Sequence, residues 1–387
     1  MRIIGLMSGT SYDAVDVAVA SFRVDGETLR LRPLGERSLP YDEELRAEIS
    51  GLLPPAATTI EAVCRLDTRL GQVFAEAATA GLELAGGRAD LVVSPGQTVF
   101  HWVEGGRARG TLQLGEATWI ARRTGVPVLS GLRGADIALG GQGAPLVPAF
   151  DALLLAPDGG APRAALNLGG IANLTVLAPD APVIGYDIGP ANALVDAAVR
   201  RWYGEPYDAD GRHAAAGRVH PRLLELLLAE PYYAAPPPKS TGKELFHPGY
   251  LDDRLAALDA AVAPDDLVAT LTELTARIVA DACDRHGVGE VVAAGGGVRN
   301  PVLWRRLGEL GAGRWRLRTV DELGVPAQAK EAYAFALLGW LSWHGLPGAL
   351  PSVTGAREAA VLGSWTPSGP PRPPGPVPAP RRLRVDR

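Results

Sequence analysis

Three glycine turns beside polar side chains are the parts of this sequence best suited to binding phosphate. The first is near the N-terminus, where an apolar run ending at Met7 leads into Ser-Gly-Thr-Ser and then Asp13 and Asp16. Backbone N–H groups and hydroxyls suit phosphate oxygens, and a carboxylate beside them suits a magnesium ion held through water. Because a second apolar run follows, the segment predicts a hairpin. Taken alone, such a tip is more often an ordinary turn than a nucleotide site.

The same chemistry recurs at two later turns. Gly169 and Gly170 separate two apolar runs and predict a second hairpin, whereas Gly295 to Gly297 follow an apolar run and precede an expected helix at 302–310. Glycine allows the backbone to approach a ligand closely, and a helix start favours an anion. Three such turns suggest one nucleotide clamped between two lobes. The expected nucleotide contacts are Gly9, Thr10, Ser11, Tyr12, Asp13, Ala14, Val15, Asp16, Gly169, Gly170, Gly295, Gly296, Gly297 and Asn300.

Two common phosphate loops are excluded. The nearest approach to a Walker loop, Gly242-Lys243, lacks both the upstream glycine and the following hydroxyl. No Gly-x-Gly-x-x-Gly opens a βαβ unit, so a dinucleotide fold has little support.

Asp187 is the residue whose position best suits acid–base chemistry. Residues 183–186 predict a strand, 189–190 a turn, and 192–203 a helix. Asp187 is therefore expected on the loop edge where α/β sheets bind ligands. The alternative is a carboxylate that only caps the following helix or turn, which is the better interpretation of an isolated aspartate. The other two glycine turns favour the functional interpretation.

The elements that must position these residues alternate between strands and helices, which predicts an α/β fold. Apolar spacing predicts helices over 59–84, 265–286 and about 328–343, the second capped by Asp265 or Asp266. At 387 residues the chain has room for two to three domains, at about 150 residues each. The proline-rich and arginine-rich end, 366–387, predicts disorder.

Composition excludes several classes of partner. The net charge is −5 and no basic stripe occurs, so nucleic acid is not expected as a partner. Cys64 and Cys283 are too few and too far apart for a disulfide framework, and no histidine pair has metal-ligand spacing. The N-terminal apolar run is too short for a signal peptide or a membrane span. We expect a cytoplasmic enzyme without membrane contacts.

Ordered motifs along the chain make it resemble one family, from Ile3 to about Trp365. They are Gly-Leu-Met-Ser-Gly-Thr-Ser (5–11), Gly-Gln-Thr-Val (96–99), Asp-Ile-Ala-Leu-Gly-Gly-Gln-Gly-Ala-Pro-Leu-Val-Pro (136–148), Asn-Leu-Gly-Gly-Ile-Ala-Asn-Leu (167–174), Gly-Tyr-Asp-Ile-Gly-Pro-Ala-Asn (185–192), Pro-Lys-Ser-Thr-Gly-Lys-Glu (238–244), Gly-Gly-Gly-Val-Arg-Asn-Pro (295–301) and Leu-Pro-Ser-Val-Thr-Gly-Ala (350–356). In these motifs the chain resembles the anhydro-N-acetylmuramic acid kinases, within the superfamily of sugar kinases, actin and the 70-kDa heat-shock chaperones.

The resemblance implies a two-lobed actin-like ATPase fold with ribonuclease H-like lobes and a nucleotide cleft between them. The expected lobes are 1–128, rejoined by about 346–365, and 129–345. It also implies that ATP phosphorylates the 6-oxygen of 1,6-anhydro-N-acetylmuramic acid while water opens the anhydro bridge, giving N-acetylmuramic acid 6-phosphate in cell-wall recycling. The implied cofactors are ATP and Mg²⁺, and a homodimer is expected.

The resemblance also implies roles for single residues. Asp187 is the general base that deprotonates the attacking water, and Asp13 holds the magnesium ion through water. The expected sugar contacts are Gln97, Thr98, Arg133, Asn173 and Glu331. For Glu331, a solvated helix glutamate is an equally good interpretation. For the 238–244 loop, the alternative to an unassigned role is a capped helix start at Ser240 or Thr241.

Departures from the family pattern gather on the sugar side. A histidine of the family is replaced by Pro95, and an acid by Gly131, while Arg133 remains as the obvious partner for a lactyl carboxylate. In the catalytic loop, Thr and Gly of the family are replaced by Ile188 and Ala191. Two other functions therefore stay open: a kinase of the same fold that acts on a different amino sugar or anhydrosugar, and a catalytically silent sugar-binding protein.

Overall fold

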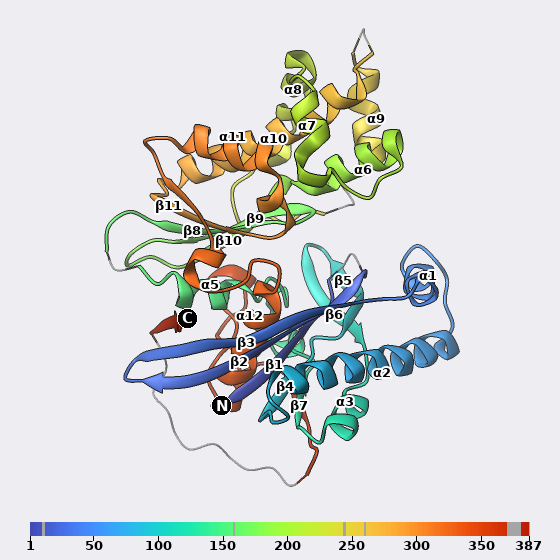
Figure 1. Ribbon diagram of the computed structural model, residues 1–387, viewed down its shortest axis with the longest axis vertical. Helices are drawn as coiled ribbons and strands as arrows, with labels where there is room; N and C mark the ends of the chain where they lie inside the picture. The colour runs from blue at the N-terminus through green and yellow to red at the C-terminus, as the bar shows by residue number, and fades with distance from the viewer. Residues whose placement is uncertain (10–11, 158, 243–244, 259–260, 370–380, 387) are drawn as a thin grey trace. The chain divides into compact units, whose positions relative to one another are not determined.

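The computed structural model describes all of the chain except residues 10–11, 158, 243–244, 259–260, 370–380 and 387 (Figure 1). Two of the expected nucleotide contacts, Thr10 and Ser11, lie outside the described residues. The chain divides into two compact units, each taken here by itself. Unit 1 comprises Met1–Ala156 and Gly324–Arg387, and unit 2 comprises Pro157–Leu323.

Unit 1 is built on a seven-stranded sheet in the order β13-β7-β4-β1-β2-β3-β14. A separate hairpin, β5 with β6, carries the Gln97 region. The strands are β1 (Arg2–Met7), β2 (Ala14–Asp25), β3 (Thr28–Pro40), β4 (Leu91–Val93), β5 (Gln97–Glu104), β6 (Arg107–Leu114), β7 (Val128–Ser130), β13 (Ser364–Thr366) and β14 (Arg382–Val385). The helices are α1 (Glu43–Leu52), α2 (Ile60–Leu84), α3 (Ala117–Thr124), α4 (Gly134–Ala138), α5 (Pro148–Leu154), α12 (Lys330–Trp343) and α13 (Pro351–Thr354).

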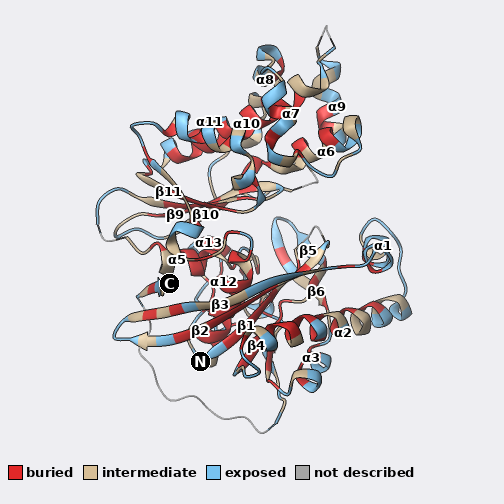
Figure 2. Ribbon diagram, in the orientation of Figure 1, coloured by how far each residue is buried: buried red, intermediate tan, exposed pale blue. Residues whose placement is uncertain are grey.

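The core of unit 1 depends on a helix that comes from the far end of the chain. Helix α12 packs against β1, β2 and β4, and Figure 2 shows buried residues along these strands and along the helix. The approach is close because Gly5 has no side chain: a Cβ there would lie 2.0 Å from the carbonyl oxygen of Ala332. At Gly339 a Cβ would lie 2.2 Å from Val93. Two glycines thus set the spacing between helix and sheet.

Unit 2 is built on a five-stranded sheet in the order β10-β9-β8-β11-β12. The strands are β8 (Arg163–Leu168), β9 (Ile171–Leu177), β10 (Ile184–Pro190), β11 (Glu290–Ala294) and β12 (Arg316–Thr319). The helices are α6 (Asn192–Tyr203), η1 (Ala209–Gly211), α7 (Arg212–Ala216), α8 (Pro221–Leu228), η2 (Pro231–Ala234), α9 (Pro248–Ala256), α10 (Pro264–Arg285), η3 (Gly296–Arg299), α11 (Pro301–Gly311) and η4 (Val320–Leu323).

The two sheets share one arrangement of five strands. In unit 1, β3, β2 and β1 are antiparallel neighbours, and β4 and β7 continue parallel to β1. In unit 2, β10, β9 and β8 are antiparallel, and β11 and β12 continue parallel to β8. The predicted α/β class and the expected relation between two lobes are therefore confirmed at the level of strand order.

The unit boundaries differ from the expected lobes. Residues 129–156 and 324–345 belong to unit 1, because β7 continues its sheet and α12 covers that sheet. The expected disorder of 366–387 is wrong in part, since β14 pairs in parallel with β3. The expected cap of the 265–286 helix is also wrong: Ala263 is the cap residue of α10, and Asp265 and Asp266 lie in its first turn beside the helix dipole.

Candidate active site

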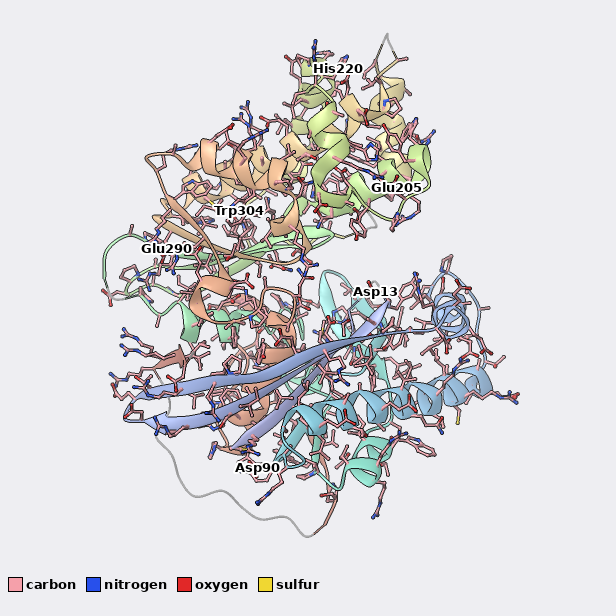
Figure 3. All side chains as sticks on the ribbon, viewed as in Figure 1. Asp13, Asp90, Glu205, His220, Glu290 and Trp304 are labelled. Atoms are coloured by element: carbon pink, nitrogen blue, oxygen red, sulfur yellow. The ribbon has the colours of Figure 1, made fainter. Side chains whose placement is uncertain are left out.

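The first predicted phosphate turn joins β1 to β2 in unit 1. Figure 3 shows Asp13 at the tip of this hairpin and Asp90 at the opposite end of β1. Tyr12 takes a φ of 42°, an uncommon conformation for a residue with a side chain, and its N–H donates to the Gly9 carbonyl over 3.2 Å. Gly9 and Tyr12 are therefore hydrogen-bonded to each other immediately before Asp13.

Gln97 supports this turn from the adjoining hairpin. Its side chain is fully buried; its Oε1 accepts from the Ser8 hydroxyl over 2.6 Å, and its Nε2 donates to the Gly9 carbonyl over 3.2 Å. Tyr41 donates to the same Ser8 hydroxyl over 2.9 Å. The amide of Gln97 is thus committed to the backbone and hydroxyls of the turn. Thr98, also predicted to contact sugar, is half-buried and accepts from Gln113 over 3.2 Å.

Two acids of the hairpin lie close enough to affect each other. Asp13 is exposed, whereas Asp16 is half-buried. Burial raises the pKa of Asp16, a hydrogen bond from Ser38 opposes this, and the charge of Asp13 raises it further. A cation beside this pair would offset both the loss of hydration of Asp16 and the repulsion between the two carboxylates. Magnesium binds through one or two carboxylates plus substrate phosphates, so the pair fits that ion.

Glu331 faces a group of charges in unit 1. It is half-buried in the first turn of α12, and burial raises its pKa, with Lys330 and Arg133 opposing the rise and Asp16 and Asp151 adding to it. A freely solvated glutamate, the alternative from sequence, is therefore wrong.

Lys330, next to Glu331, forms an ion pair that the sequence did not reveal. Its Nζ lies 2.7 Å from Asp151 Oδ1, and the two side chains are 6% and 5% exposed. Removing one partner of a pair this deeply buried would strand the other charge.

Arg133 is held by its own loop. Its guanidinium donates to the Gly143 carbonyl over 2.8 Å, and burial lowers its pKa while Glu331 opposes that shift. The Gly143 N–H in turn donates to the buried carboxylate of Asp136 over 2.7 Å, as does the Thr354 hydroxyl, also over 2.7 Å. Asp136 and Thr354 each lie in one of the quoted motifs, so motif membership was the signal available for them.

The other two glycine turns lie together in unit 2. Gly295 takes a φ of 87°, and a Cβ there would lie 2.6 Å from Asn167 Oδ1 and 2.9 Å from Leu168. Across the hairpin turn, the N–H of Asn192 donates to the Gly169 carbonyl over 3.0 Å. Bare backbone from β8, β9, β11 and the start of α6 thus gathers at one end of the sheet. The predicted convergence of the Gly9 turn on this place stays a prediction.

Asn300, also predicted to contact nucleotide, caps a helix. Its Oδ1 accepts from the N–H groups of Val302 and Leu303 over 3.0 and 3.2 Å at the start of α11. This is an ordinary use of an asparagine at that position.

Asp187 lies within β10, not after it as expected. It pairs with Asn173 of β9, which pairs with Asn167 of β8, and a bulge follows between Asp187 and Gly189. Residues paired directly across antiparallel strands share one face of the sheet. Asn167, Asn173 and Asp187 therefore form a polar row that leads from the edge strand to the Gly295 turn. Pairing register, which motif reading cannot supply, brings them together.

The carboxylate of Asp187 is held by the 238–244 loop. Its Oδ2 accepts from the Ser240 hydroxyl over 2.9 Å and from the Thr241 N–H over 3.1 Å. Helix α6 has Ala191 as its cap residue, so the helix-cap interpretation of Asp187 is wrong. The capped helix start expected at Ser240 or Thr241 is also wrong, because the next helix, α9, is capped by His247. Residues 243–244 of the loop lie outside the described residues.

Similarity to known proteins shows the family of this chain. The model of the family "Anhydro-N-acetylmuramic acid kinase" matches residues 1–368. An anhydro-N-acetylmuramic acid kinase of Streptomyces coelicolor is 58% identical over 100% of this chain and 99% of its own length. The chain belongs to the anhydro-N-acetylmuramic acid kinase family. A relative of the same name from Rhodococcus erythropolis is 53% identical over 100% of both chains.

Two solved structures have low sequence identity to this chain. The activator of 2-hydroxyisocaproyl-CoA dehydratase from Clostridium difficile, with bound ADPNP, has a TM-score of 0.41 and 13% identity, covering 87% of this chain and 93% of its own. The ROK hexokinase from Thermus thermophilus has a TM-score of 0.39 and 16% identity, covering 88% and 99%.

Two features are absent from the described residues of this family member. These residues contain no group of three or more His, Cys, Asp or Glu side chains that could hold a metal ion. No helix in that part of the chain is long and apolar enough to cross a membrane.

Proposed function

We propose that the protein is an ATP-dependent hydrolytic sugar kinase that converts 1,6-anhydro-N-acetylmuramic acid to N-acetylmuramic acid 6-phosphate in the recycling of cell-wall peptidoglycan. Membership of the family supports the substrate. The observation that carries the mechanism is the polar row ending at Asp187, which connects a half-buried carboxylate through Asn173 to Asn167 at the Gly295 turn.

The proposed reaction needs a base for water, not for the sugar. The 6-oxygen is tied into the anhydro bridge and has no proton to lose. Water attacks carbon 1 and gives its proton to Asp187, the bond from carbon 1 to the 6-oxygen breaks, and the released oxygen accepts the γ-phosphoryl group of ATP. General-base catalysis of this kind contributes about 10²- to 10⁴-fold. The Ser240 and Thr241 donors fix the orientation of the Asp187 carboxylate to which we assign the proton.

Backbone of the two glycine turns in unit 2 is proposed to bind the phosphates. Gly169, Gly170 and Gly295 to Gly297 present main chain without side chains at the end of the sheet. The Gly9 turn and Asp13 are the proposed phosphate and magnesium contacts of unit 1. Magnesium would supply neutralisation of phosphate charge, as in other phosphoryl transfers.

Arg133, Glu331 and Asn173 are the proposed sugar contacts. A guanidinium suits the lactyl carboxylate because it can donate two parallel hydrogen bonds. Gln97 and Asn300 are now better assigned to holding the Gly9 turn and to capping α11. Because the reaction consumes ATP, we propose the cytoplasm as its location. The homodimer remains a proposal, tested by light scattering of the purified chain.

Isotope transfer tests the proposed reaction directly. The full chain, ATP, Mg²⁺ and 1,6-anhydro-N-acetylmuramic acid are incubated in ¹⁸O-water, and the products are analysed by mass spectrometry. We expect ADP and a sugar phosphate carrying one ¹⁸O on carbon 1, with none in the phosphate. Label in inorganic phosphate without a sugar phosphate would contradict the proposal.

A second candidate, a kinase for another amino sugar or anhydrosugar, is favoured by Pro95 and Gly131. Pro95 is buried, and Gly131 takes a φ of 62°, a conformation that favours glycine. A panel of such sugars in an ADP-release assay separates the candidates. Turnover of another sugar alone would support this one, and sugar binding without ADP release would support a silent binder.

A further inference from the structure

The position of Asp187 depends on a short segment that runs along the outer edge of β10. The N–H of Asp187 donates to the Lys239 carbonyl over 3.3 Å, and the next two residues, Ser240 and Thr241, donate to its carboxylate. β10 is the edge strand of its sheet. Because both donors come from one short segment, a displacement of residues 239–241 would remove both hydrogen bonds from the carboxylate.

The side chain of Lys239 ties that segment to η2. Its ammonium donates to the carbonyls of Tyr232 and Tyr233 over 2.9 and 3.2 Å and lies 4.5 Å from the centre of the Tyr232 ring. The Tyr232 hydroxyl then donates to the carbonyl of Asp187 over 2.8 Å. The Lys239 side chain thus joins the segment to η2, and the Tyr232 hydroxyl joins η2 to Asp187.

The ammonium also borders a cavity of about 360 Å³. Tyr186, Tyr233, Ile278, Asp281 and Arg285 share its lining with Lys239. Glu230, the acid that precedes η2, is paired with Arg254 over 2.9 Å. The ammonium is therefore held by carbonyl oxygens and aromatic faces, which hold a cation less firmly than a carboxylate does.

We propose that Lys239 is a positioning residue for the reaction: its ammonium fixes the segment 239–241 against η2 and so orients the Asp187 carboxylate. The inference rests on the proposed role of Asp187 as the base. Loss of the ammonium charge frees the segment, and Ser240 and Thr241 no longer hold the carboxylate in line with the attacking water.

The charge of Lys239 changes in an accessible pH range. Burial, together with the nearby charge of Arg285, lowers the pKa of Lys239 to about 8. Tyr186 stays neutral there because burial raises its pKa to about 12, burial also raises that of Tyr233, and His286 is neutral because burial lowers its pKa. The other charged groups facing the site are Glu230, Arg254, Asp281 and Arg285. Turnover should therefore fall as pH rises through about 8.

Two substitutions of Lys239 in the full chain test the proposal through the pH profile of kcat. Lys239→Met keeps the length but removes the charge, so kcat should be about 10-fold or more below wild type at pH 7 and should not fall further above pH 8. Lys239→Arg keeps its charge throughout, so kcat should stay level past pH 9. KM for ATP should change little in either.

Arg285→Met is the matched control, because Arg285 lines the same cavity and also donates to the Tyr233 carbonyl, over 3.2 Å. Removing its charge raises the pKa of Lys239, so the fall in kcat should survive and move to higher pH. A fall above pH 8 that persists in Lys239→Met, or a normal kcat in that variant together with unchanged amide exchange, would overturn the proposal.

Hydrogen exchange of the peptide around Thr241 separates this proposal from the function on which it rests. Exchange of the Thr241 and Asp187 amides should be faster in Lys239→Met, with an unchanged melting temperature showing that the fold persists. Faster exchange without any change in kcat would support the proposal that Lys239 holds segment 239–241, and it would reject Asp187 as the base. Unchanged exchange would reject this role of Lys239, whichever sugar the enzyme phosphorylates.

Discussion

Asp187 combines two properties at the residue scale that the reaction needs together. It is half-buried, and two donors from the 238–244 loop meet the same carboxylate oxygen. Hydrogen bonds to a charged acceptor are worth more than neutral ones, so they fix the group firmly. The donors belong to the loop and not to α6, whose cap residue is Ala191.

Asp187→Asn should lower kcat by about 10²- to 10⁴-fold while ATP still binds. The amide oxygen can accept from Ser240 and Thr241 as the carboxylate does, so the fold should be kept and only the base lost. Steady-state kinetics and nucleotide titration measure the two effects. Asp90→Asn is the control, since this exposed acid accepts from the Arg2 N–H at the other end of β1. Near-normal turnover of Asp187→Asn would disprove the assignment.

Arg133→Ala should raise KM for 1,6-anhydro-N-acetylmuramic acid by about 10- to 100-fold, because a hydrogen bond to a charged group is lost. An analogue without the lactyl group should be affected much less. Asp136→Asn, which disturbs the loop but keeps the guanidinium, should affect both sugars alike. Equal losses on both sugars in Arg133→Ala would show that Arg133 is only structural.

At the scale of elements, glycines decide how near a helix can come to a sheet. Gly5 lets α12 lie directly on β1, and Gly339 does the same against Val93 of β4. Glu331 and Lys330 stand at the start of that helix. The close packing of α12 on the sheet therefore also fixes the positions of Glu331 and Lys330.

Gly5→Ala should destabilise the protein by about 1–3 kcal/mol or more, since the added methyl would meet the Ala332 carbonyl oxygen at 2.0 Å and the Ala336 nitrogen at 2.8 Å. Backbone atoms on a packed helix cannot move aside as a side-chain end can. Gly51→Ala is the matched control: it lies in α1 with nothing within 4 Å, and alanine favours a helix by about 0.5–1 kcal/mol. Urea midpoints compare the two, and a Gly5→Ala midpoint equal to wild type would contradict the packing.

At the scale of the whole molecule, the two units differ in how the chain builds them. Unit 2 is one continuous segment with its own apolar core, whereas unit 1 is completed only after unit 2 has been made. The helix that closes unit 1, α12, covers β1, β2 and β4, whose residues would otherwise be exposed. We therefore expect unit 2 to fold independently and the N-terminal part of unit 1 not to do so.

Residues 157–323 expressed alone should fold cooperatively, because all five strands and the core of unit 2 are present. Residues 1–156 expressed alone should not, because the apolar residues under α12 would face water, at about 25 cal/mol per Å² of surface exposed. Circular dichroism and thermal melting measure both. A melt without a transition for 157–323, or a cooperative one for 1–156, would contradict this.

The sequence by itself determined the family, the α/β class and the glycine turns, and it predicted Asp187 as the base. These depend on local order: apolar periodicity gives helices and strands, and ordered motifs give family membership. The long helices at 60–84 and 330–343 were found for the same reason.

Only the tertiary structure decided which of the predicted site residues meet. The row of Asn167, Asn173 and Asp187 follows from strand register, and the donors to Asp187 come from a loop more than fifty residues further on. Gln97 and Asn300 proved to have supporting contacts, because burial and capping depend on neighbours that spacing along the chain does not reveal. The unit boundaries shifted because α12 packs where glycine leaves room, a property of distance in space and not of sequence order.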